Sequence, residues 1–141
     1  MKDTEILIGN DRFATVNGMQ LDEVADGYAK TSMLVTPAHL NGVGIVQGGA
    51  VFTLADLAFA AASNSHENVA VAINVSISFL KATTTGKLTA EARELFVNPK
   101  LGSYSVNVTD ETGDLVAVFQ GMVYRKRELV ADLAKKIRQD K

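Results

Sequence analysis

A single carboxylate, that of Asp56, lies within an otherwise apolar stretch, AVFTLADLAFAAA at residues 50–62. Because this stretch has no polar face, we expect it to form a helix that is buried on all sides. Burial disfavours the charged form of a carboxyl group and raises its pKa, so a buried Asp needs hydrogen-bond donors or a substrate. Two interpretations follow, a catalytic carboxylate and a structural side chain bonded to a neighbouring element, and the helix alone does not separate them.

Two glycines, Gly48 and Gly49, stand directly before this stretch. The first turn of a helix carries unpaired N–H groups and the positive end of the helix dipole, and glycine lets a ligand approach those groups closely. An acyl carbonyl that becomes an oxyanion could bind there. The pair alone is explained as simply by an awkward turn before the helix. With a carboxylate on the same helix, however, it supplies an electrophile-polarising group beside a base or nucleophile.

The segment LNGVGIVQGGAVFTLADLAFAAASNS, residues 40–65, resembles the signature of PaaI-type thioesterases, hotdog-fold enzymes that hydrolyse acyl-CoA thioesters. Their pattern runs approximately LNxxxxxHGGxxFxLAD and continues into an alanine-rich helix. The resemblance extends more weakly over residues 10–126, including SFLKA at 78–82, and leaves residues 127–141 as an additional C-terminal helix. It implies an α+β hotdog fold, in which an antiparallel sheet wraps around a long central helix.

The resemblance also implies roles for single residues. Asp56 matches the catalytic carboxylate, Gly48 the glycine whose N–H polarises the thioester carbonyl, and Asn41 an asparagine that lines the site. Gly49 and Thr53 lie at the start of the same helix, where we expect them to contact the substrate. Asp56 could attack the carbonyl carbon itself and form a mixed anhydride, or it could deprotonate a water molecule, and both routes stay open.

Gln47 is the departure from the pattern, because the family usually has histidine at this position. Glutamine donates and accepts hydrogen bonds, but it cannot exchange protons near neutral pH as imidazole does. We therefore expect Gln47 to orient the thioester or a water molecule. The two histidines of the chain, His39 and His66, are expected to be solvated loop residues rather than replacements for the missing imidazole.

Lys81 lies at the end of a predicted strand and matches a basic position of the family. Its ammonium group could contact the phosphates of CoA, since such a contact requires little exact geometry. An exposed lysine at the end of a strand more often serves only solubility. Both interpretations stay open.

Composition places the chain among compact soluble proteins. Its 141 residues suit one domain, and its net charge of -2 with 47% hydrophobic residues indicates neither disorder nor a nucleic-acid partner. The absence of cysteine excludes a disulfide framework and thiol catalysis, and with two histidines we expect no metal site. No cofactor is expected, because CoA is part of the substrate. The N-terminus lacks the apolar core of a signal peptide and the apolar helix is too short to span a membrane, so we expect a cytoplasmic protein.

The remaining sequence predicts the elements that position the apolar helix. A short helix is expected from Asn10 to Val16, and the amphipathic segment at 124–141 predicts a terminal one. Strands are expected at residues 19–24, 28–35, 69–80, 87–97, 103–109 and 115–124. The strict alternation of 69–80, with every second residue from Val69 to Phe79 large and apolar on one face, predicts a central strand. One antiparallel sheet then covers one helix.

We expect hydrolysis of an acyl-CoA, of an aryl- or phenylacetyl-CoA type. Two alternatives come from other functional classes. A hotdog hydratase or dehydratase would need a histidine beside its carboxylate, and Gln47 argues against it. A noncatalytic acyl-CoA-binding or regulatory domain would use the same pocket without turnover, and the change at Gln47 keeps this alternative open.

The spacing of the two main site residues predicts an oligomer. Gly48 and Asp56 are eight residues apart, which is about 12 Å along a helix, so one small carbonyl cannot contact both. A two-fold axis that sets the helices of two subunits antiparallel would bring Asp56 of one chain to Gly48 of the other. The resemblance implies the same homodimer, which could associate further into a dimer of dimers, a homotetramer.

Overall fold

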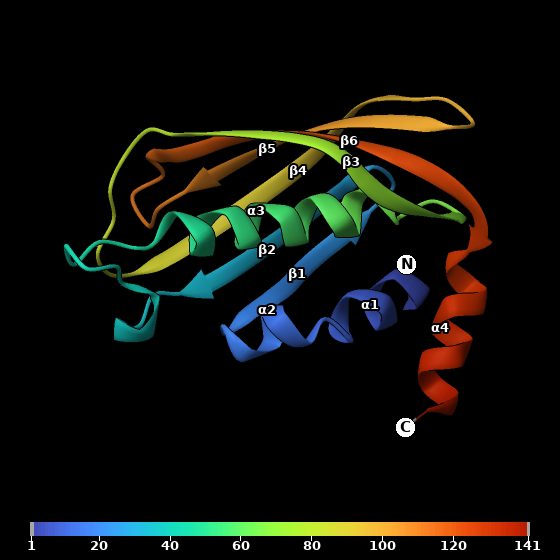
Figure 1. Cartoon of the computed structure of the whole chain (residues 1–141), viewed down its shortest axis with the longest axis horizontal. Coiled ribbons are helices and arrows are strands. Elements are labelled where there is room, and N and C mark those ends of the chain that lie inside the picture. The colour runs from blue at the N-terminus through green and yellow to red at the C-terminus, as the bar shows by residue number, and fades with distance from the viewer. Residues whose placement is uncertain (1, 141) are drawn as a thin grey trace.

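The computed structural model describes residues 2–140, which form one six-stranded antiparallel sheet curved around the helix α3, Gly48–Ser63 (Figure 1). The strands are β1 Met19–Ala25, β2 Tyr28–Leu34, β3 Asn68–Phe79, β4 Lys87–Val97, β5 Leu101–Thr109 and β6 Leu115–Leu129, in the spatial order β1-β2-β4-β5-β6-β3. The helices α1 Lys2–Gly9 and α2 Arg12–Val16 precede the sheet, η1 Pro37–His39 follows β2, and α4 Val130–Gln139 follows β6. The predicted α+β hotdog arrangement is confirmed.

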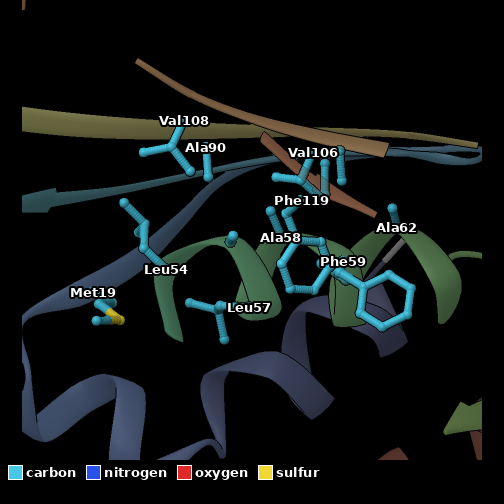
Figure 2. Packing of buried hydrophobic residues seen from close by; sticks show 14 of the residues in the cluster. Met19, Leu54, Leu57, Ala58, Phe59, Ala62, Ala90, Val106, Val108 and Phe119 are labelled. Carbon is cyan, nitrogen blue, oxygen red and sulfur yellow. The ribbon is translucent and has the colours of Figure 1, made fainter. Parts of the chain in front are cut away.

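The core lies between α3 and the concave face of the sheet. Leu54, Ala58 and Phe59 of the helix point toward apolar side chains of β4, β5 and β6 (Figure 2). The ring of Phe59 lies 5.4 Å from that of Phe119, a distance typical of tilted aromatic pairs. A Cβ at Gly121 would come within 2.6 Å of the Phe59 ring, so only glycine at this position of β6 lets the helix approach so closely.

One stripe of α3 is not covered within the single chain. Gly49, Phe52, Thr53, Asp56 and Ala60 are each partly or fully exposed, and their spacing of three or four residues places them on one side of the helix. The expectation that α3 is buried on all sides was therefore wrong for the isolated subunit. The opposite side of the helix carries the core residues, and Asp56 lies on the open side.

The predicted central strand is an edge strand. β3 pairs with β6 alone, and the register between them shifts around Ile73, which is a β-bulge residue with no partner. A bulge inserts one residue and reverses which side chains face the core. Val75 is opposite Gly121 on the helix side, whereas Val71 is opposite Tyr124 on the other face. The alternation therefore does not mark one buried face, and most of the strand is exposed.

The two ends of the chain differ most from the prediction. The helix α1 was not predicted, and α2 is capped by Asp11 rather than Asn10. β6 continues past its predicted end, and α4 packs against α1 beside the sheet (Figure 1). Strands β1, β2, β4 and β5 lie within two residues of their predicted bounds. Within residues 2–140 no helix is long and apolar enough to span a membrane.

Candidate active site

A short hairpin-like loop leads into the first turn of α3. Leu40 and Val46 form an isolated antiparallel bridge, and the N–H of Gln47 donates to the carbonyl of His39 at 2.8 Å. Val46 also donates its N–H to the carbonyl of Thr83, also at 2.8 Å, which fixes the loop to the segment after β3. These bonds hold Gln47 at the N-cap position of α3.

The backbone amides of this first turn have unequal partners. The side-chain Oε1 of Gln47 accepts a hydrogen bond from the N–H of Gly49, and its main-chain carbonyl accepts from Ala50 and Val51. Among the described residues, the N–H of Gly48 has no acceptor. The first turn therefore presents one free donor at the positive end of the helix dipole, at the residue predicted from the sequence for this role.

Close approach at Gly48 depends on the absence of a side chain. A Cβ there would lie 3.2 Å from the Phe79 ring of β3, which is closer than most real contacts of this kind. The side-chain amide of Gln47 provides a second free donor group, because its Oε1 is engaged by Gly49 and its Nε2 has no acceptor within the described chain. Two neighbouring residues thus each have a free donor, one of the main chain and one of a side chain.

Asp56 is half-buried on the uncovered stripe of α3. Desolvation raises the pKa of its carboxyl group, and the negative charge of Asp11 raises it further. No described residue donates a hydrogen bond to this carboxylate or pairs with it, so it lacks the partners that a structural Asp would need. Asp11 itself caps α2, since its Oδ1 accepts from the N–H of Ala14 at 2.9 Å.

The single chain does not bring Asp56 to the free donor. Asp56 and Gly48 belong to one continuous helix, Gly48–Ser63, so they are separated by about two turns, or about 12 Å along its axis. The carboxylate and the amide of one subunit cannot act on the same carbonyl.

Asn41 shapes the loop before the helix. Its Oδ1 accepts from the N–H groups of Val43 at 3.0 Å and Ile45 at 3.3 Å, and the chain turns through Gly44 with a φ of 83°. A positive φ at this point favours glycine. The side-chain amide of Asn41 makes no hydrogen bond with Gly48 or Asp56, so its predicted place in the site stays a prediction.

A hollow of about 420 Å³ lies beside the first turn of α3. Its walls include the predicted residues Gln47, Gly49 and Thr53, and the Thr53 hydroxyl donates to the Gly49 carbonyl at 2.7 Å. The remaining lining residues come from α2, from the start of β1, from η1 and from α3: Phe13, Asn17, Met19, Ala38, His39, Ala50 and Phe52. Neither Asp56 nor Lys81 reaches this hollow.

Neither histidine is the solvated loop residue that was expected from the sequence. His39 is 6% exposed, its Nδ1 accepts from the N–H of Thr36 at 2.9 Å, and its Nε2 donates to the carbonyl of Asn17 at 2.8 Å. His66 is half-buried and lies 2.6 Å from the carboxylate of Glu94. Both rings are engaged in structural contacts, which leaves no imidazole to take the place of the missing family histidine.

Lys81 is already neutralised by acidic partners. Its ammonium lies 2.6 Å from Asp110 and 2.7 Å from Asp114, and the hydrogen bond that it donates to Asp110 is the main reason why the pKa of Lys81 is raised. A phosphate placed here would meet a net negative cluster. The structure therefore does not favour the predicted contact with CoA, which stays a prediction. Among residues 2–140 no group of three His, Asp or Glu side chains could hold a metal ion.

Comparisons with known proteins agree with the fold. Residues 43–117 match the model of the thioesterase superfamily. A putative esterase of Archaeoglobus fulgidus is 43% identical over 120 residues, which are 84% of this chain and 78% of that protein. The acyl-coenzyme A thioesterase PaaI of Escherichia coli is 36% identical over 117 residues, 82% of this chain and 84% of that protein.

A solved structure extends the similarity to the three-dimensional arrangement. The structure of the E. coli PaaI protein from the phenylacetic acid degradation operon superimposes with a TM-score of 0.87 at 32% sequence identity, and the match covers 91% of this chain and 94% of that one. The chain therefore belongs to the thioesterase superfamily and is a hotdog-fold thioester hydrolase of the PaaI type.

Proposed function

We propose that the protein hydrolyses acyl-CoA thioesters at the first turn of α3. The observation that carries this proposal is the free N–H of Gly48 at the positive end of the helix, next to a hollow that could hold an acyl group. Such a donor stabilises the negative charge that develops on the carbonyl oxygen in the transition state. A well-placed donor of this kind contributes about 3 kcal/mol.

Gln47 supplies the second donor in this proposal. Because its Oε1 is held by the Gly49 N–H, the side chain is fixed with its Nε2 group available for the carbonyl oxygen or for a water molecule. This role requires no proton transfer, so glutamine can fill it where the family usually has histidine. The site then depends on Asp56 alone for acid–base or nucleophilic chemistry.

Asp56 acts as a carboxylate in either of two routes. As a base it takes a proton from water while the water oxygen attacks the carbonyl carbon, and as a nucleophile it attacks that carbon directly. In both routes the oxyanion is held by the donors at Gly48 and Gln47, and the carbon–sulfur bond then breaks. In the nucleophilic route this leaves a mixed anhydride on Asp56, which water hydrolyses to release the acid and regenerate the carboxylate. The products are the free acid and CoA, whose thiolate takes up a proton.

The reacting Asp56 comes from a second subunit. A two-fold axis that places Asp56 opposite the Gly48 of a partner passes midway between them, at Phe52, which lies on the uncovered stripe of α3. β3 is an edge strand, and its outer edge is a second surface without a partner. Both features support a homodimer. Association into a dimer of dimers, and a cytoplasmic location, stay predictions.

The acyl group that we propose is an aryl or phenylacetyl group. The phenyl rings of Phe13 and Phe52 both line the hollow, and apolar walls of this kind suit an aromatic acyl group. The similarity to the PaaI protein from a phenylacetic acid degradation operon supports the same substrate class.

The test is hydrolysis of a panel of acyl-CoAs, measured by thiol release, for the wild type and for Asp56→Asn. The substitution keeps the volume but removes the charge and the basicity, so turnover should fall by at least about a hundredfold while acyl-CoA still binds. Asp132→Asn makes the same chemical change on the exposed side of α4 and should leave turnover unchanged. If Asp56→Asn stays within about threefold of the wild type, the assignment is wrong.

The same panel separates the alternatives. A noncatalytic acyl-CoA-binding domain would bind the ligands and release no thiol. A hydratase or dehydratase would change the acyl chain without releasing CoA, and it would need a proton-transferring partner for Asp56. The engaged rings of His39 and His66 argue against such a partner.

A further inference from the structure

The short helix α2 is held in place by hydrogen bonds at both of its ends. Five residues are too few to form a stable helix alone. Asp11 caps its start, the Asn17 side-chain amide donates to the carbonyl of Phe13 at 2.9 Å, and the buried His39 donates to the carbonyl of Asn17 at 2.8 Å. Ala14 is buried in the core. The position of Phe13 is therefore well defined, although its side chain is 66% exposed.

The Phe13 side chain forms one wall of the hollow beside the first turn of α3. The second aromatic residue that lines the hollow is Phe52, whose ring packs 5.5 Å from that of Phe119 and is thus fixed to the core. Phe13 has no such aromatic partner among the described residues, and its side chain is exposed in the single subunit. It is the wall whose size can change without disturbing the core.

The other lining groups favour an apolar occupant. Both ring nitrogens of His39 are already hydrogen-bonded, and the Thr53 hydroxyl is bonded to a main-chain carbonyl, so neither requires a ligand partner. The free polar group is the amide of Gln47, which lines the hollow together with Gly49, and these two residues flank Gly48 in the chain. A thioester whose carbonyl binds at Gly48 would extend its acyl group between Phe13 and Phe52.

We infer that Phe13 determines which acyl group the site accepts, by closing the solvent side of the hollow around a compact aromatic acyl group and excluding long unbranched chains. This inference rests on the proposed function, since it assumes that the thioester carbonyl binds at Gly48. It goes beyond that function by assigning selectivity to a residue outside α3 and its preceding loop. The buried His39 is a positioning residue in this scheme, because it holds the end of α2.

The experiment compares kcat/KM for phenylacetyl-CoA and dodecanoyl-CoA in Phe13→Ala, Phe13→Leu and the wild type. Phe13→Ala should lower the preference for phenylacetyl-CoA by about tenfold or more, since the aromatic wall is lost and the hollow opens outward. Phe13→Leu should give an intermediate preference. Val16→Ala is the matched control, because Val16 is 85% exposed on the same helix and does not line the hollow.

The outcomes separate this inference from the function it rests on. If the wild type hydrolyses acyl-CoAs but the preference of Phe13→Ala stays within about twofold of it, Phe13 does not contact the acyl group and the inference is overturned. It is also overturned if Val16→Ala shifts the preference equally, since the effect would then come from the helix as a whole. If the wild type releases no thiol from any acyl-CoA, the proposed function fails and the inference fails with it. Should Phe13→Ala not fold, Phe13→Leu decides.

Discussion

Complementation between two inactive variants tests whether each active site is shared by two subunits. One variant is Asp56→Asn, which removes the carboxylate. The other is Gly48→Val, which blocks the free amide: even a Cβ at this position would lie 3.2 Å from the Phe79 ring, and a branched side chain would fill the space that the carbonyl needs. Each homodimer should be inactive, because both of its sites carry the same defect.

The expected recovery follows from the position of the two residues on α3. If Asp56 of one subunit works with Gly48 of the other, a heterodimer of the two variants has one intact site and one site with both defects. Random mixing makes about half of all dimers heterodimers, and half of their sites work, so the mixture should show about a quarter of the wild-type activity. If each subunit had a complete site, the heterodimer would contain none that is intact.

The assay is thiol release from the best acyl-CoA, with the two variants carrying different affinity tags so that heterodimers can be purified. Purified heterodimers should reach about half of the wild-type activity per dimer, because one of their two sites is intact. Gly48→Ala is a milder control that tests whether the loss in Gly48→Val comes from misfolding, which a thermal unfolding curve would also show. No recovery from verified heterodimers would refute the reasoning from the 12 Å separation along the helix.

Three further predictions concern single residues of the site. Burial and the charge of Asp11 raise the pKa of Asp56, so the acid limb of the kcat/KM profile should lie at a higher pH than an ordinary Asp would give. Asp11→Asn keeps the α2 cap and should move this acid limb to lower pH. An unshifted limb would mean that Asp11 does not act on Asp56. Gln47→His should keep or increase activity, whereas Gln47→Ala should lose about tenfold in kcat with a folded protein; an alanine variant as active as the wild type would exclude Gln47 from the site. Lys81→Ala should leave KM for acyl-CoA within about twofold of the wild type, because its ammonium is already paired with two carboxylates. A large increase in KM would instead support a contact between Lys81 and the phosphates of CoA.

The sequence predicts the centre of the fold well because local signals there agree. Gly48 and Gly49 mark the start of α3, the apolar run continues to its end, and the glycine-containing turns separate β1 from β2 and β5 from β6. The sequence also points to Gly48 and Asp56, which the structure places at the free amide and on the uncovered stripe of α3. Their roles in catalysis stay predictions until the variants are measured.

Features that depend on distant contacts could not be predicted. The bulge at Ile73 is set by the pairing of β3 with β6, and the alternation of large and small residues passes through it without a visible break. The burial of His39 follows from bonds to Thr36 and Asn17, the second of which is 22 positions away in the chain. A histidine two residues after a proline gives no local sign of such a partner. The capping residues of α2 are visible in the sequence, but the effect of Asp11 on Asp56 is not.

The edge of β3 and the uncovered stripe of α3 are both compatible with one two-fold axis. A two-fold axis perpendicular to the sheet at the edge of β3 reverses the direction of every element that runs parallel to the sheet. The two copies of β3 then run antiparallel and can continue the ladder through their unpaired backbone groups. Because α3 packs on the same sheet, the same rotation sets the two copies of α3 antiparallel, as the separation of Gly48 and Asp56 requires. In the dimer that we propose, catalysis would depend on assembly, and a change at the β3 edge would alter the site without any contact with the substrate.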